Sequence, residues 1–278
     1  MKVRLTVICE NSVGLPFKVV GEHGFACYVE TEKGKWLFDT GQGFGILQNS
    51  IALQKDLRQI ESVMISHGHY DHTGGLPTVL GLRGKVDVYA HPEIFTERYI
   101  VFGGVKRDIG IPFRRCYLES LGANFRLNRE MTEVGHGIWL TGEIPRKTAF
   151  EKGDANMAAC MPDGSIVQPD PIKDDLSMLV ESDKGLILVL GCAHAGLVNI
   201  LNYVIEKTGK DRIYAIIGGT HLGFCSDEQF EETVKAIDRY HIEKIGVSHC
   251  TGLINAARLH AIFKERFFFG CVGSVLEG

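Results

Sequence analysis

The chain has 278 residues, of which 45% are hydrophobic and 23% are charged, an ordinary composition for a globular protein. Its net charge of −4 lacks the basic excess of nucleic-acid-binding domains, so we expect no nucleic-acid partner. No apolar run approaches the ~20 residues that a membrane span needs, and the first residues indicate a strand rather than a signal peptide. We therefore expect a cytoplasmic protein without a membrane partner, whose eight scattered cysteines are reduced thiols.

Short apolar runs punctuated by glycine predict buried strands in the first half of the chain. They cover residues 4–9, 25–30, 35–39, 62–66 and 86–90. Helical patterns are predicted near residues 45–57, 76–82, 93–99, 197–207, 227–240 and 254–265. Strands that alternate with helices predict a mixed α/β architecture. The aromatic run Phe267-Phe-Phe269 is either a core edge strand or a subunit contact, which leaves the oligomeric state open.

Two pairs of segments resemble each other. Val29-Glu-Thr-Glu-Lys-Gly34 matches Val180-Glu-Ser-Asp-Lys-Gly185, and both predict a hairpin that turns at Lys-Gly. Residues 61–67 match residues 243–249, and both segments end in Ser-His. We interpret the matches as a structural duplication: two similar sheets face each other, with helices outside and strand-end histidines between them.

The middle of the chain, residues 96–171, is loop-rich and carries several basic clusters. These are Lys106-Arg107, Arg114-Arg115, Arg126, Arg129 and Arg146-Lys147. Acidic residues are interleaved, so one interpretation is a solvated surface. The other is a lid or substrate loop in which Arg114 and Arg115 bind an anionic group of the substrate. We predict one domain over residues 1–278, with residues 96–171 as this lid or substrate loop.

The most informative segment is Ser66-His-Gly-His-Tyr-Asp-His-Thr-Gly-Gly-Leu76. Its three imidazoles and one carboxylate within six positions are ligands for a borderline-soft divalent metal such as zinc. His67 and His69 stand two apart on extended backbone, so their side chains point the same way and can share one ion. Asp71 and His72 follow at the start of a helix and can reach a second ion. The segment therefore predicts a site for two metals.

Further candidate ligands lie in the second half of the chain. His194, His221 and His249 each follow an apolar strand and stand beside glycine or small residues. Strand ends are where α/β sheets place their chemistry, so we count all three as candidates. His23 precedes a core strand and is a candidate contact to a ligand or to the substrate. Two cysteines next to these histidines, Cys192 and Cys250, are interpreted as small buried residues that pack a strand end.

These residues together resemble the metallo-β-lactamase superfamily. The motifs that carry the resemblance are Phe38-Asp-Thr-Gly41 and His67-x-His69-x-Asp71-His72, followed by His194 and His249. They stand in the family's order and cover the chain from about residue 3 to residue 275. The resemblance implies a four-layer αβ/βα sandwich of two facing β-sheets with helices outside.

The resemblance also implies two divalent metal ions, with zinc expected and manganese or iron as alternatives. The first ion would be held by His67, His69 and His194. The second would be held by Asp71, His72 and His249, with Asp39 as a structural brace. The family usually has a bridging aspartate in a Gly-Asp-Thr-like segment, but here that segment is Gly218-Gly-Thr-His221. His221 would be a ligand or a substrate contact, or a hydroxide alone would form the bridge.

The fuller set of motifs is similar to one branch of the superfamily, archaeal and bacterial proteins labelled dihydropterin-ribofuranosylaminobenzene 5'-phosphate synthases. The segments concerned are Glu22-His-Gly-Phe25, Leu37-Phe-Asp-Thr-Gly-Gln42, Gly191-Cys-Ala-His194, Gly218-Gly-Thr-His-Leu222 and His249-Cys-Thr-Gly252. The implied reaction joins a dihydropterin-methyl diphosphate to a phosphorylated ribosyl-aminobenzene and releases pyrophosphate.

Three functions compete. The first is a metal-dependent hydrolase of a small anionic, phosphate-bearing substrate, in which the ions lower the pKa of a bridging water toward ~7. Asp71 and His221 are then the candidate catalytic residues, Asp71 because it can orient the nucleophile or accept its proton. The second is the dihydropterin-methyl transferase. The third is a metal-binding protein without catalysis, supported only by the absence of the bridging aspartate.

Overall fold

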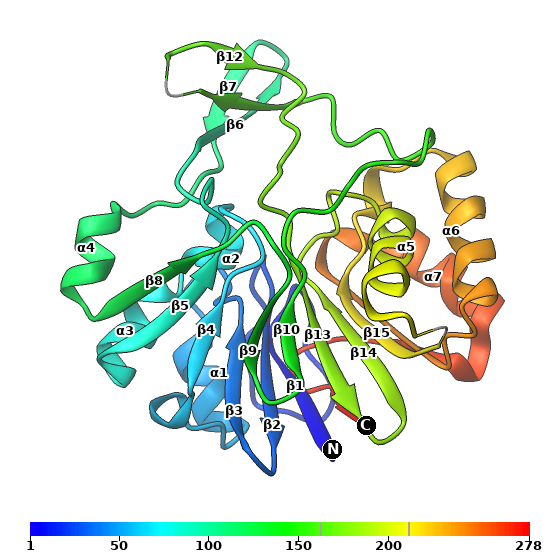
Figure 1. Ribbon diagram of the computed structural model, residues 1–278, viewed down its shortest axis with the longest axis horizontal. Helices are drawn as coiled ribbons and strands as arrows, with labels where there is room; N and C mark the ends of the chain where they lie inside the picture. Colours follow the sequence, from blue (N-terminus) through cyan, green and yellow to red (C-terminus); the bar gives the residue numbers. More distant parts are fainter. Residues whose placement is uncertain (162, 211) are drawn as a thin grey trace.

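Two seven-stranded sheets pack face to face and carry helices on their outer surfaces (Figure 1). This computed structural model describes residues 1–161, 163–210 and 212–278, so residue 162 of the predicted lid segment lies outside the described residues. The layers follow the order helix, sheet, sheet, helix, which confirms the predicted αβ/βα sandwich. Among the described residues, no helix has both the length and the apolar character needed to cross a membrane.

The first sheet has the strand order β18-β1-β2-β3-β4-β5-β8 and combines antiparallel pairs with parallel ones. Its strands are β1 (Val3–Cys9), β2 (Ala26–Thr31), β3 (Gly34–Phe38), β4 (Ser62–Met64), β5 (Val86–Ala90), β8 (Ala123–Leu127) and β18 (Val275–Glu277). The helices of this half are α1 (Ile46–Ala52), η1 (Leu57–Gln59), α2 (Tyr70–Thr73), α3 (Leu76–Arg83) and α4 (Arg115–Ser120). A buried apolar cluster that includes Leu37, Ile46 and Leu76 joins these helices to the sheet.

The second sheet has the order β17-β16-β15-β14-β13-β10-β9. Its strands are β9 (Thr132–Gly135), β10 (Ile138–Leu140), β13 (Ser177–Ser182), β14 (Gly185–Leu190), β15 (Ile213–Gly219), β16 (Lys244–Ser248) and β17 (Phe267–Phe269). The helices of this half are α5 (Leu197–Thr208), η2 (Leu222–Phe224), α6 (Asp227–Arg239), η3 (His249–Thr251), α7 (Leu253–Phe263) and η4 (Lys264–Arg266). The run 267–269 is therefore the edge strand of this sheet.

Alternating side chains place the core between the sheets. On β14, Ile187 and Val189 face the first sheet, whereas Leu188 and Leu190 face the helices. This period of two is expected for a strand that is buried on both faces. Both halves thus share one central apolar layer, which fixes how the strand ends of one sheet meet those of the other.

One predicted helix and one predicted repeat are wrong. Residues 93–99 were expected to be helical, but β6 (Glu97–Phe102) begins there because β-forming residues precede the turn at Gly103-Gly104. The hairpin repeat is confirmed, since β2–β3 and β13–β14 are both antiparallel hairpins. The second repeat is not a structural equivalence: β4 pairs directly with β3, whereas β15 separates β16 from β14. The shared Ser-His ending follows β4 in the first sheet and β16 in the second. The two strands hold different positions in the order of their sheets.

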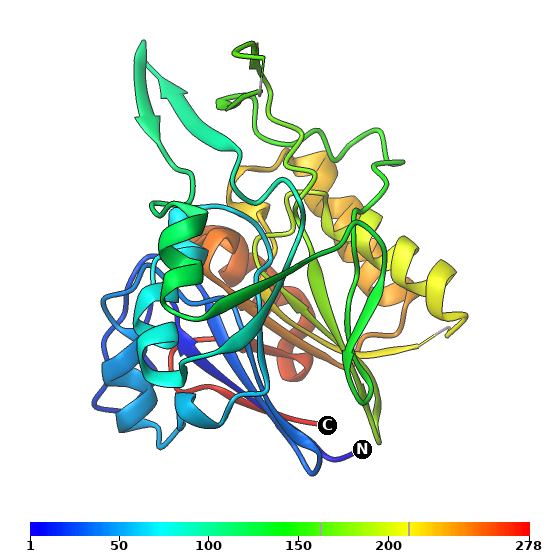
Figure 2. The same cartoon turned by 60° about the vertical axis from the view of Figure 1, so that its left-hand side comes forward.

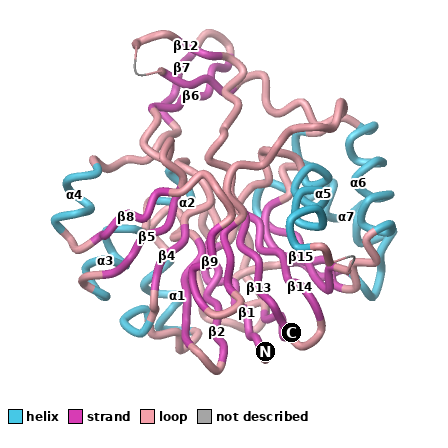
Figure 3. Tube along the Cα trace, in the orientation of Figure 1, coloured by secondary structure: helices cyan, strands magenta, loops and turns pink. Residues whose placement is uncertain are grey.

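The segment 96–171 divides into two parts. Its β8, β9, β10 and α4 belong to the main sandwich. A third sheet of four strands contains β6 together with β7 (Val105–Asp108), β11 (Met157–Cys160) and β12 (Ile166–Val167). It projects beyond α2, at the end of the sandwich opposite the two termini (Figures 1 and 2). Long loops connect it to the body (Figure 3).

A buried ion cluster anchors this third sheet. Arg98 of β6 is 1% exposed and donates hydrogen bonds to both carboxylate oxygens of Asp174, at 2.6 and 2.9 Å. It also bonds Asp170 at 2.9 Å. Asp174 in turn accepts from the backbone N–H of Gly68, between the first two predicted metal ligands. The cluster therefore joins the projecting sheet to the metal-binding loop.

Replacing Arg98 should destabilise the fold strongly. Arg98→Leu leaves two buried carboxylates without their cation, and we expect a loss of about 3–5 kcal/mol in the free energy of unfolding. The matched control is Arg126→Leu, because the half-exposed Arg126 pairs with Asp87 at the surface, where an ion pair contributes less than about 1 kcal/mol. Chemical denaturation measures both. Equal small losses in the two variants would contradict the anchoring role.

Candidate metal centre

The predicted ligands converge from the ends of strands in both sheets. His67 and His69 follow β4, while His194 follows β14 and His249 follows β16. These four residues, with Asp71 and His72 at the start of α2, are all buried. Because the two sheets face each other, their strand-end loops enclose one polar centre between them. The structure therefore brings together all six residues that the resemblance assigned to two metals.

The first set of ligands is His67, His69 and His194. His67 Nε2 and His69 Nδ1 lie 2.9 Å apart, and the His194 ring centroid lies 4.8 and 5.0 Å from those of His67 and His69. Within the part of the chain that the structure describes, the Nε2 atoms of His69 and His194 are buried without a hydrogen-bond partner. A buried polar atom without a partner is unfavourable, and a bound cation would satisfy these nitrogens. The set fits a metal ion.

The second set centres on the Asp71 carboxylate. Its Oδ2 lies 3.2 Å from His249 Nε2 and 3.8 Å from His72 Nε2. It also lies 3.2 Å from Nε2 of His23, whose side chain is 54% exposed at the rim of the centre. Two imidazoles and one carboxylate at this spacing match the oxygen and nitrogen ligands that zinc accepts. His23 thus contacts Asp71, a candidate ligand, and groups with Asp71 and His249 as a further possible donor.

Partners outside the two sets orient the rings. Asp39 Oδ2 accepts from His72 Nδ1 at 2.7 Å, Ser66 Oγ lies 2.8 Å from His67 Nδ1, and Asn11 Oδ1 lies 2.9 Å from His249 Nδ1. In each case the partner holds Nδ1, so Nε2 is the nitrogen that faces the other candidate ligands. Asp39 also accepts from the backbone N–H and the hydroxyl of Ser66, both at 2.7 Å. Asp39 has the bracing position predicted for it.

Burial and neighbouring charge set the protonation of the centre. Burial lowers the pKa values of His67, His69 and His194 well below the ordinary value, so these rings are neutral, the form that binds metal. Burial also disfavours the charged form of His72, but Asp39 and Asp71 outweigh it and raise its pKa to about 9. The pKa of Asp71 falls well below its usual range, because His72, His23 and His249 outweigh burial.

The backbone of the centre is held in an uncommon conformation. Four residues other than glycine have left-handed φ values of 51–59°: Asp39, Ala193, His221 and His249. Each such residue costs about 1–3 kcal/mol and persists only where the surrounding structure determines it. The sandwich therefore fixes the positions of these side chains against the local preference of the chain.

His221 lies beside the first set. Its ring centroid is 4.3 Å from that of His194, and both of its ring nitrogens are buried without a partner among the described residues. It also shares a group of candidate donors with Cys192 and Cys250, whose ligand atoms lie within 4.8 Å of one another. His221 is therefore at the centre, as predicted, and its donors face the two cysteines as well as His194.

The structure does not bring Arg114 and Arg115 to the centre. Arg115 is the first residue of α4 and Arg114 is its N-cap, and this helix lies at the outer edge of the first sheet beside β8 (Figure 1). Arg115 pairs instead with Glu119 one turn further along the helix. A run of basic residues in the sequence does not show whether their side chains face the site or the solvent. On an exposed helix they can all point to solvent.

Other basic residues lie closer to the ligands. Arg146 donates to the backbone carbonyl of His194 at 2.6 Å, and it lines a cavity of about 200 Å³ with Lys173, Asp175 and Ala195. Asp175 accepts from the Ala195 N–H next to His194, and burial raises its pKa to about 6. The sequence analysis counted Arg146 among the basic clusters of the middle segment but did not select it for substrate binding, because only the fold brings it to His194.

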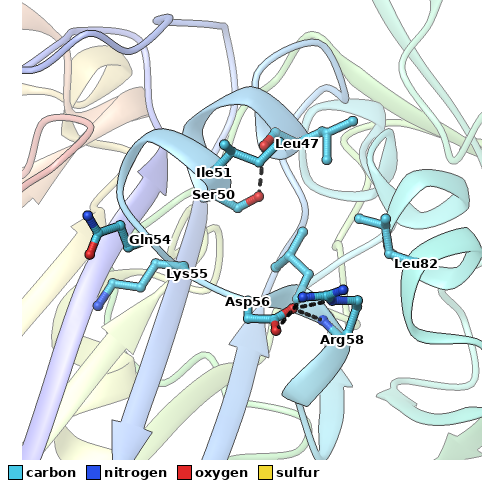
Figure 4. Close-up of a pocket in the computed structure, with 9 residues that line it drawn as sticks. Leu47, Ser50, Ile51, Gln54, Lys55, Asp56, Arg58 and Leu82 are labelled. Atoms are coloured by element: carbon cyan, nitrogen blue, oxygen red, sulfur yellow. Dashed lines mark hydrogen bonds and ion pairs between the residues drawn. The ribbon is translucent and has the colours of Figure 1, made fainter.

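A larger hollow, of about 400 Å³, lies on the outer helices of the first sheet (Figure 4). It is lined from α1 and η1, and its charged residues Asp56 and Arg58 pair with each other at 2.8 Å. None of the predicted site residues lines it. The candidate ligands and this hollow therefore lie in different parts of the molecule.

Comparison with known proteins agrees with the geometry. The family model described as the metallo-beta-lactamase superfamily matches residues 20–156. A relative from Methanocaldococcus jannaschii, named 7,8-dihydropterin-6-methyl-4-(beta-D-ribofuranosyl)-aminobenzene-5'-phosphate synthase, is 31% identical over 95% of this chain and 93% of its own. The chain belongs to the metallo-beta-lactamase superfamily.

Solved structures extend the comparison. A crystal structure described as a metal-dependent hydrolase of the beta-lactamase superfamily matches with a TM-score of 0.83 and 28% identity, over 99% of both chains. The metallo-beta-lactamase fold protein YhfI from Bacillus subtilis matches with a TM-score of 0.58 and 11% identity, over 100% of this chain and 99% of that chain. The second match shows the fold alone. The predicted superfamily and fold are confirmed.

The ligand assignment predicts different results for two histidines. His67→Ala removes a buried ligand of the first ion, and we expect its loss to abolish binding of that ion. His23→Ala removes a half-exposed group at the rim, so we expect metal content at the wild-type level. Elemental analysis of the purified proteins, with circular dichroism to verify folding, measures both. Wild-type metal content in folded His67→Ala would refute the assignment.

Proposed function

We propose that this chain is a metal-dependent hydrolase of a small anionic, phosphate-bearing substrate. The supporting observation is the convergence of two sets of ligands from both sheets on one buried centre. His67, His69 and His194 would hold one divalent ion, and Asp71, His72 and His249 a second. Such a pair, when bound, supplies a water of lowered pKa and stabilises a developing oxyanion.

Asp71, His23 and His221 would have different roles in the reaction. The low pKa of Asp71 favours a ligand over a general base, since a weak base accepts a proton poorly at neutral pH. His23 lies 3.2 Å from Asp71 and reaches solvent, so it is the group placed to carry a proton away from the centre. Hydrogen bonding to Asp71 raises the pKa of His23, which favours its protonated form. His221 contributes nitrogens that face the centre beside His194.

Binding of the anionic substrate is assigned to the cavity beside His194. Arg146 and Lys173 line it, and Lys173 is exposed to solvent. A phosphate there would meet a positive charge next to the first metal set. We propose that the third sheet acts as the lid over this end, within a single domain of residues 1–278 that shares one core.

A second candidate is the transferase reaction. The relative that is 31% identical over 95% of this chain is named as a synthase of a dihydropterin-methyl-ribofuranosylaminobenzene phosphate. In that reaction the same residues would bind a diphosphate leaving group instead of activating water. The metal centre supports both chemistries, so the co-substrate decides between them.

The deciding assay uses metal-loaded protein and dihydropterin-methyl diphosphate, with and without the ribosyl-aminobenzene phosphate. Hydrolysis predicts release of pyrophosphate without the amine, whereas the transferase predicts release only when the amine is present. No turnover of this compound would remove the transferase and direct the search for hydrolysis to phosphodiesters, phosphate esters and lactones. Inactivity on all of them, in protein shown to hold its metals, would contradict both proposals and support a metal-binding role without catalysis.

Lys173→Ala tests the anion-binding cavity. Loss of one charged contact to the substrate should cost ~1 kcal/mol and raise KM roughly 5-fold, with kcat nearly unchanged. The control is Lys147→Ala, since Lys147 pairs with Glu206 at the surface, at 3.0 Å. Initial-rate kinetics on the hydrolysed substrate measure both. Unchanged KM in the Lys173 variant would remove this cavity from the site.

A further inference from the structure

The sulfur of Cys192 stands between the two sets of ligands. Cys192 follows β14, is 3% exposed, and places its Sγ 3.2 Å from His72 Nε2. Its Sγ forms one group of donors with His67 and His194, and another with His72 and His249, each group lying within 4.8 Å. The first pair belongs to the first metal set and the second pair to the second. A single sulfur atom is thus within ligand range of both metal positions.

The place of the absent bridging aspartate is occupied by this cysteine-bearing loop. Gly219 stands where the superfamily's Gly-Asp-Thr-like segment has its aspartate. A Cβ atom at Gly219 would lie 2.8 Å from Cys250 Sγ and 3.3 Å from Cys192 Cα, and it would also collide with the Gly191 carbonyl oxygen. These contacts exclude a side chain at position 219. The sulfur of Cys250 fills the space that a side chain at position 219 would need, and the backbone of Cys192 lies beside it.

We propose that the Cys192 thiolate bridges the two metal ions in place of the aspartate. This inference rests on the metal-dependent function proposed above. The thiol releases its proton to solvent as its sulfur bonds to both ions. With zinc–sulfur bonds of about 2.3 Å, one sulfur spans ions up to about 4.6 Å apart. Two-metal hydrolases hold their ions about 3.5–4 Å apart, so the bridge is geometrically allowed.

A bridge formed by Cys192 leaves Cys250 with a packing role and predicts which metal the centre prefers. Cys250 Sγ accepts a hydrogen bond from the backbone N–H of His221 at 3.2 Å and contacts the Cys192 carbonyl at 3.5 Å. It groups with Cys192 and His221 but with neither pair of the two metal sets, so it packs the bridge and does not form it. A bridging thiolate favours zinc over harder ions such as manganese or magnesium. This assignment revises the sequence interpretation of Cys192 as a packing residue.

X-ray absorption of the zinc-loaded wild-type protein tests the bridge without any substitution. We expect a sulfur shell at about 2.3 Å in addition to nitrogen and oxygen ligands at about 2.0–2.2 Å. Two bound zinc ions with only nitrogen and oxygen neighbours would overturn the bridge and leave the metal-dependent function standing. Absence of bound zinc would overturn both, so the two failures are distinguishable.

Two matched variants identify the sulfur. Cys192→Ser should lose the sulfur shell, whereas Cys250→Ser, a neighbouring thiol of the same size, should keep it. Cobalt-substituted samples give an independent readout, because thiolate ligands add a near-ultraviolet charge-transfer band that Cys192→Ser should abolish. A sulfur shell or band that survives Cys192→Ser in folded protein would overturn the proposal, and so would one that only Cys250→Ser removes.

Discussion

The structure depends on the burial of many nitrogen donors at the seam between the two sheets. His69, His194 and His221 bury ring nitrogens that have no partner among the described residues. Each such atom costs roughly 1–3 kcal/mol when it is left unsatisfied. The central apolar layer holds the sheets together, so the strand ends meet and these ring nitrogens stay buried despite the unfavourable free energy. Cations between the loops would offset it, and any ligand that binds only the folded chain raises its stability. We therefore expect metal binding to stabilise the fold of this molecule.

Hydrogen bonds from buried carboxylates connect that centre to the rest of the molecule. Asp39 fixes the ring of His72, while Asp174 connects the Gly68 amide to Arg98 in the third sheet. These hydrogen bonds connect the projecting sheet to the loop that carries His67 and His69. The left-handed residues at the strand ends show that this geometry is imposed by the sandwich and not by local sequence.

The sequence predicted most of the residues that the structure brings together at this centre, because their signal is local. Residues 67–72 hold four donors in one short segment, and the remaining histidines follow recognisable buried strands. Contacts between distant segments left no such signal: Arg98 and Asp174 are 76 residues apart, and Arg146 reaches His194 across 48 residues. The sequence analysis assigned Arg114 and Arg115 to a substrate loop, whereas the structure places them exposed at the start of α4. The sequence analysis interpreted Cys192 as a packing residue because cysteine is small and often buried. Its proposed role depends on the histidines that surround it in the fold.

The central claim is that the strand-end histidines and Asp71 form a two-metal centre. Anomalous scattering at the zinc edge from crystals of the metal-loaded protein tests it most directly. The account predicts two peaks about 3.5–4 Å apart, one among His67, His69 and His194 and the other among Asp71, His72 and His249. A centre without anomalous density, or metal found only elsewhere on the chain, would contradict it.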